Sequence, residues 1–176
     1  MFRWGLAFAT ILALVLGPGC SRRSEAPFAP GVALTYQVSY TAGDRTEHYD
    51  VTLKFKGKPG SLKADFEVNP PEHGGGNLND QEYSDRRPMK FPHMGAEVVV
   101  GQLYLAAADR QVGLVTPTGR ITGKRTHEGF DVWAISGTSG FQLGTRFYDQ
   151  SSGVLVGWNF EGITSKLVSP IPTKKQ

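Results

Sequence analysis

Hydrophobic and polar residues alternate along most of the chain. In the run 32–40 (VALTYQVSY) the large apolar residues occupy every second position, and the same pattern returns over 49–55 and 62–68. A period of two is typical of a β-strand that buries one face. Turn-forming residues separate these runs at 42–44 and 58–60. Three consecutive alternating runs with short turns predict an antiparallel meander.

The alternation resumes in the C-terminal half, where glycine-containing turns again separate short apolar runs. Strands are expected at about 98–100, 111–116, 120–127, 130–136, 141–148, 154–160 and 163–168. Residues 103–108 are ambiguous between a helical turn and a short irregular segment, and we favour the irregular segment. The chain shows no convincing amphipathic helix. We therefore predict an all-β domain in which an antiparallel meander forms a curved sheet or an open barrel.

Segment 69–95 interrupts this pattern. It contains Pro70-Pro71, a run of three glycines at 74–76 and many charged residues. A loop of this length is uncommon in a compact domain, and it is usually either functional or disordered. We expect a long loop here that could dock on a partner.

The amino terminus has the organisation of an export signal. A short start with one basic residue, Arg3, precedes the uncharged run 5–16, and Gly17-Pro18-Gly19 follows. This pattern predicts a helical signal peptide over residues 1–19. A transmembrane helix needs about 20 apolar residues, so a permanent span is disfavoured.

Cys20 is the only cysteine and follows the signal segment directly. An exported protein with one cysteine needs an explanation for its thiol. Gly19-Cys20 before polar residues resembles the lipobox of bacterial lipoproteins, although Gly17 stands where leucine is usual. The resemblance implies an acylated Cys20 that anchors the protein in a membrane of the cell envelope, facing the periplasm in a Gram-negative cell. Ordinary cleavage with a free thiol is the alternative.

Composition and charge set the domain organisation and exclude one class of partner. Residues 20–30 are expected to form the lipidated cysteine and a flexible tether, 31–170 a single β domain, and 171–176 a tail. The formal net charge of +3 falls to +2 when the signal, with Arg3, is removed. This mild and scattered excess gives no reason to expect nucleic acid as a partner.

Candidate catalytic and metal-binding groups are sparse. His48 and Asp50 share the polar face of one expected strand, and Ser39 could complete a nucleophile, base and orienting group. His73 and His93 share segment 69–95 with several acidic residues, but no spacing matches a known metal site. We therefore expect no enzyme activity, no metal and no cofactor, and a hydrolase is the least favoured hypothesis.

Large aromatic residues on the apolar parity of their strands are the remaining functional signal. Tyr36, Phe66, Phe147 and Trp158 are candidates for an apolar ligand-binding face, because a single curved sheet lacks a second layer to cover all of them. The alternative is that they fill a closed core.

Residues 148–155 (YDQSSGVL) resemble a YD-x-x-[ST]-G-x-L hairpin of many exported bacterial β proteins. Some of those proteins are carriers that hold acyl chains inside a half-barrel. The leading hypothesis is a non-enzymatic envelope lipoprotein that binds a lipid or another apolar ligand. The alternative is a structural or assembly lipoprotein that docks on an envelope protein through segment 69–95.

Overall fold

The computed structural model describes residues 26–58, 61–73, 78–85, 87–93, 96–137, 143–160 and 162–173. The expected signal peptide and Cys20 lie outside these residues. The all-β prediction is confirmed: the described chain consists of strands and two short 3-10 turns, η1 (Pro71–His73) and η2 (Ala107–Asp109). No helix among the described residues is long and apolar enough to span a membrane.

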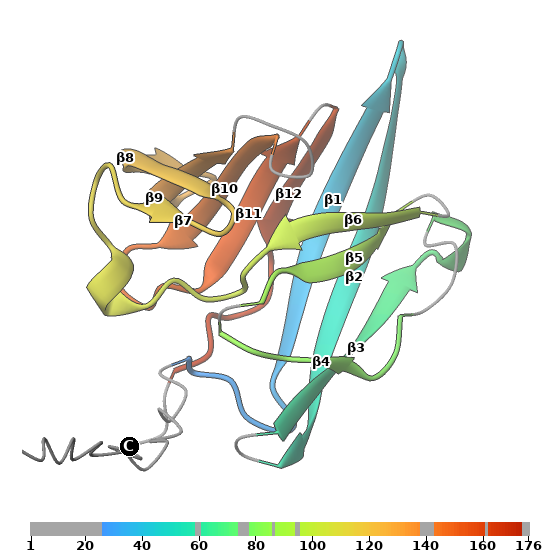
Figure 1. Cartoon of the computed structure of the whole chain (residues 1–176). Coiled ribbons are helices and arrows are strands. Elements are labelled where there is room, and N and C mark those ends of the chain that lie inside the picture. Colours follow the sequence, from blue (N-terminus) through green and yellow to red (C-terminus); the bar gives the residue numbers. More distant parts are fainter. Residues whose placement is uncertain are drawn as a thin grey trace, which may run out of the picture.

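Ten strands form one antiparallel sheet, in the order β4-β3-β2-β1-β12-β11-β10-β9-β8-β7. Their bounds are β1 Ala33–Ala42, β2 Arg45–Lys58, β3 Ser61–Asn69, β4 Gln81–Glu82, β7 Val115–Thr116, β8 Gly119–His127, β9 Phe130–Gly137, β10 Gly144–Asp149, β11 Leu155–Phe160 and β12 Ile163–Leu167. Two meanders, β1 to β4 and β7 to β12, join where β12 pairs with β1 (Figure 1). The edges β4 and β7 do not pair with each other, so the sheet is open and not a barrel.

The period-two pattern determines which face of the sheet is buried. Tyr36 lies opposite Val51 in β2 and opposite Leu167 in β12, and all three side chains are buried. Leu53 lies opposite Phe66 in β3 in the same way. Directly opposite residues point to the same face of an antiparallel sheet, so these side chains form one continuous apolar layer. We call this layer the inner face.

A separate hairpin covers part of the inner face. It consists of β5 (Met89–His93) and β6 (Ala96–Gly101), which in the described chain pair only with each other. Figure 1 shows this hairpin crossing in front of β1 and β2. Met89 and Phe91 are buried against the inner face. The described part of segment 69–95 therefore contains η1, β4 and β5, whereas the sequence predicted a loop.

The domain also begins earlier than the sequence indicated. Ala26 and Phe28 are buried, although both lie in the segment 20–30 that we expected to be a flexible tether. The ring of Phe28 stacks on Phe55 of β2 with 4.7 Å between their centroids. The amide of Gly31 also donates to the carbonyl of Phe55 at 2.8 Å, which continues the attachment along β2.

Candidate functional site

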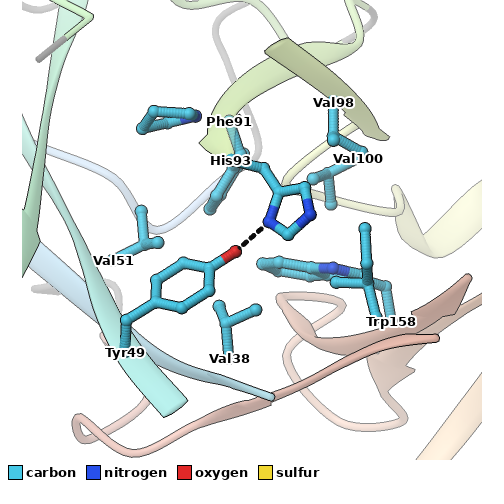
Figure 2. A pocket seen from close by; sticks show the side chains of 10 residues that line it. Val38, Tyr49, Val51, Phe91, His93, Val98, Val100 and Trp158 are labelled. Carbon is cyan, nitrogen blue, oxygen red and sulfur yellow. Dashed lines mark hydrogen bonds between the residues drawn. The ribbon is translucent and has the colours of Figure 1, made fainter. Parts of the chain in front are cut away.

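A small apolar recess lies between the β5–β6 hairpin and the inner face, as Figure 2 shows. Its apolar lining comes mainly from Val38, Val51, Phe91, Val98, Val100 and Trp158. The recess has a volume of about 10 Å³, which is room for about one water molecule. In this conformation it is too small for a lipid chain, so binding of an apolar ligand requires the hairpin to move.

Phe91 of the hairpin is the centre of the aromatic cluster beside this recess. Its ring centroid lies 5.6 Å from that of Tyr36, 4.8 Å from Phe66 and 4.9 Å from Trp158, each in an edge-on arrangement. Edge-to-face pairs at these distances are favourable. Three of the four candidate residues from the sequence therefore lie together, at 0 to 2% exposure, and a residue of segment 69–95 covers them.

Phe147, the fourth candidate residue, lies on the opposite face of the sheet. It stands opposite Gly157, whereas its neighbour Arg146 stands opposite Trp158 on the inner face. The ring of Phe147 stacks on His127 at 3.7 Å between centroids, under the guanidinium of Arg125. It is buried there, away from the recess.

Arg146 explains why the sequence pattern misassigned this strand. Its guanidinium donates to the carbonyl oxygens of Val100 at 2.7 Å and Val99 at 3.4 Å, and lies 4.6 Å from the ring centroid of Phe160. Hydrogen bonds and an aromatic face allow an arginine to be fully buried. These bonds also hold the β6 end of the hairpin to β10.

Titratable groups gather at the other end of the hairpin. The Tyr49 hydroxyl of β2 is hydrogen-bonded to Nδ1 of His93, and the ring of Tyr40 lies edge-on to His93 with 4.9 Å between centroids. His73 of η1 stacks on Tyr49 at 5.6 Å, and its Nδ1 lies 3.3 Å from Oε2 of Glu47. We call Tyr40, Glu47, Tyr49, His73 and His93 the rim cluster. His73 and His93 share segment 69–95, and no sequence pattern places them beside Tyr49.

Burial shifts the pKa values of two members of the rim cluster, Tyr49 and His93. It lowers the pKa of His93 and raises the pKa of Tyr49, so the neutral forms of both are favoured near pH 7. A neutral imidazole can accept a hydrogen bond from the tyrosine hydroxyl at Nδ1. In that tautomer the ring proton is on Nε2.

We expect the protein to lose stability as the pH falls below about 6.5. Burial lowers the pKa values of His93 and His127 in the folded state, so the unfolded chain binds more protons as the pH falls through this range. Urea unfolding at a series of pH values should show a free energy of unfolding that declines below pH 6.5. The decline should be shallower in His93→Gln than in the parent protein. Equal pH dependence in His93→Gln and the parent protein would contradict this assignment.

The candidate catalytic residues form a single exposed pair. Ser39 Oγ lies 2.9 Å from Nδ1 of His48 across β1 and β2. Asp50 stands opposite Gln37, and among the described residues no hydrogen bond joins a ring N–H of His48 to the Asp50 carboxylate. The orienting group of a nucleophilic triad is therefore not in place. The described residues also contain no group of three acidic, histidine or cysteine side chains that could hold a metal ion.

The YDQSSGVL motif forms a structural turn. Asp149 Oδ2 accepts hydrogen bonds from the hydroxyls of Ser151 and Ser152, and the hydroxyl of Tyr148 donates to the carbonyl of Gln102 at 2.9 Å. Burial alone would raise the pKa of Asp149, but these serine hydrogen bonds lower it. The motif therefore stabilises the β10–β11 turn and attaches it to the chain that leaves the hairpin.

The rest of that attachment comes from Arg110, which follows η2. Its guanidinium donates to four main-chain carbonyls, those of Leu105, Gln150, Ser151 and Ser152, at 2.9 to 3.1 Å. The amide of Leu105 also donates to the carbonyl of Gly153 at 2.8 Å. The structure thus provides an apolar recess, a hairpin that covers it, and a hydrogen-bonded attachment of the chain that leaves the hairpin. Comparison with protein-family models, curated proteins and solved structures finds no match to this chain.

Proposed function

We propose that this chain is a non-enzymatic lipoprotein of the cell envelope. It is anchored through acyl chains on Cys20, and it binds the acyl chain of a lipid between the β5–β6 hairpin and the inner face. The observation that carries the binding proposal is the hairpin itself, a separate two-stranded sheet laid over an aromatic layer beside an apolar recess.

The attachment of the hairpin supports a role as a displaceable cover. Side chains of the main sheet hold it: Gln81 donates to the Lys90 carbonyl at 3.1 Å, Tyr49 bonds His93, and Arg146 bonds the β6 carbonyls. A two-stranded hairpin has little stability of its own. It can therefore separate from the inner face without disrupting the strand pairing of the ten-stranded sheet.

The energetics favour an acyl chain as the ligand. Removing Phe91 from its site exposes a side chain whose burial contributes about 1.5–3 kcal/mol. Each methylene that a ligand buries contributes about 0.8 kcal/mol. A chain that places about four methylenes against Tyr36, Phe66 and Trp158 therefore offsets the exposure of Phe91. Met89 and Val100 of the hairpin are also buried, so separating the whole hairpin requires a correspondingly longer chain.

Filling the recess should weaken binding. Val98 lines it, while its neighbour Val99 does not, and both are half-buried on β6. We expect Val98→Phe to lower the affinity for a fluorescent fatty acid by about tenfold, because the added ring occupies the space of about two methylenes. Val99→Phe is the matched control and should bind within about twofold of the parent protein. Equal effects of the two variants, or no binding by the parent protein, would refute the acyl-chain proposal.

The alternative function, docking on an envelope protein through segment 69–95, has no comparable support. Met89 and Phe91 of that segment are buried in the core, and β4 belongs to the sheet. Deleting the segment would therefore remove part of the fold, and it would not isolate a docking loop.

A further inference from the structure

Both chain ends leave the domain on the same side. Ala26 and Phe28, at 5% and 8% exposure, hold the N-terminal end against β2. At the C-terminal end, the amide of Val168 donates to the carbonyl of Thr35 at 2.9 Å, and Ile171 packs on the core. β12 runs antiparallel to β1, so the chain after Leu167 continues past the start of β1. Figure 1 shows the first and last described segments next to each other, beside the lower part of β1.

The length of chain between the candidate anchor and the domain limits their separation. Five residues, 21–25, lie between Cys20 and Ala26. Fully extended, this connection spans at most about 20 Å. β2 has 14 residues and is about 45 Å long. An acylated Cys20 therefore keeps the Phe28 side of the domain within about 20 Å of the membrane. The β1–β2 turn, about 45 Å away along β2, is not held in this way.

Basic residues adjoin both described chain ends in the sequence. Arg22 and Arg23 precede Ala26, and Lys174 and Lys175 follow the last described residue. Lys58 is exposed at the end of β2, close to where Gly31 bonds Phe55. Positive residues near an anionic membrane surface each strengthen binding about fivefold.

Few acidic residues adjoin these chain ends in the sequence. Glu25 is the only acid in 20–30, and residues 168–176 contain none. On the sheet, Asp65 and Asp80 form ion pairs with Lys56 at 2.7 and 3.1 Å.

We propose that the side of the domain carrying Phe28, Lys58 and Ile171 lies against an anionic bilayer surface. We call it the membrane-facing end. This inference rests on the acylated Cys20 of the proposed function. It places the rim cluster away from the bilayer, because Tyr40 and Tyr49 lie in the halves of β1 and β2 that are farther from this end. A ligand would then enter the recess from the aqueous side.

Energy transfer to the membrane tests this orientation in the acylated full-length mature protein. One dye is attached at Ala29→Cys on the membrane-facing end or at Asp44→Cys in the β1–β2 turn, both exposed positions. The protein is reconstituted in phosphatidylglycerol vesicles with acceptor dyes on the headgroups. We expect efficient transfer from position 29 and less than about half of that from position 44, given about 45 Å of intervening strand. Equal transfer, or stronger transfer from position 44, overturns the proposal.

A charge variant tests whether the surface itself contributes. Lys58→Glu should reduce transfer from position 29 by moving the domain off the anionic surface, while Arg45→Glu at the opposite end of β2 should not. Reversing one charge corresponds to about a 25-fold weaker surface association. No change in Lys58→Glu, or equal changes in the two variants, overturns the contact with anionic lipid.

Failure of the underlying function gives a different result. If the Cys20 peptide of the mature protein carries no acyl mass, the anchored function is wrong and the orientation falls with it. If the acyl chains are present and transfer from the two positions is equal, only the orientation is wrong.

Discussion

Gly153→Ala is expected to destabilise the protein by about 4 kcal/mol or more, enough to unfold many small domains. Gly153 has a φ of +79°, where an L-residue costs about 1–2 kcal/mol. A Cβ atom added there would lie 2.2 Å from Nη2 of Arg110 and 2.3 Å from the carbonyl oxygen of Leu105. The Arg110 guanidinium would have to leave its carbonyls, and each hydrogen bond to a charged group contributes about 1.5–3 kcal/mol.

Gly129→Ala provides the matched control for this prediction. Gly129 lies in the β8–β9 turn with a φ of +85°, but an added Cβ would meet no atom within 4 Å. It should therefore show the backbone cost of about 1–2 kcal/mol alone. Urea unfolding of both variants measures the difference, which we expect to be about 3 kcal/mol. Similar losses in the two variants would show that the Arg110 contacts add nothing to the stability of the turn.

The sequence was sufficient to predict the first three strands because their pairing is local. The expected runs 32–40, 49–55 and 62–68 correspond to β1, β2 and β3, and their shared apolar parity gives the inner face. Short turns between alternating strands leave little choice of partner. The pairing of β12 with β1 joins the two ends of the domain, and no local pattern indicated it.

Segment 69–95 was misassigned because its strands are short and contain residues typical of loops. β4 has two residues and β5 contains Pro92, which disfavours a strand in sequence-based reasoning. β5 accommodates the proline because the hairpin stands apart from the main sheet. Met89 and Phe91 do alternate with Lys90 and Pro92, and this was the one signal that could have indicated a buried strand.

The candidate site could be predicted only in part for a related reason. Tyr36, Phe66 and Trp158 share a face, and the sequence predicts this because every second side chain of a strand points to the same side. Phe147 does not join them, because Arg146 takes the buried position through hydrogen bonds to carbonyls 46 and 47 residues away in the sequence. Such partners are set by tertiary structure, so the usual rule that charged side chains face solvent gave the wrong face.

Phe91→Ala is expected to destabilise the protein by about 3–5 kcal/mol, because the ring is buried among Tyr36, Phe66 and Trp158. If the hairpin is a separable cover, the loss should fall mainly on its own attachment. Hydrogen exchange should then show that the amides of 89–101 lose protection, while those of β1 and β2 keep more of theirs. The same variant should bind small apolar molecules more tightly, because the deleted ring leaves an apolar cavity.

Phe55→Ala separates this effect from a general loss of core packing. Phe55 is equally buried, but it packs on Phe28 and Tyr83 away from the hairpin. Phe55→Ala should lower the free energy of unfolding by about 3–5 kcal/mol as well. It should not cause a selective loss of amide protection at 89–101. If the hairpin amides respond equally to both substitutions, the hairpin unfolds only with the whole domain. Access of a lipid chain to the inner face would then require global unfolding, and the hairpin could not serve as the cover of a binding site.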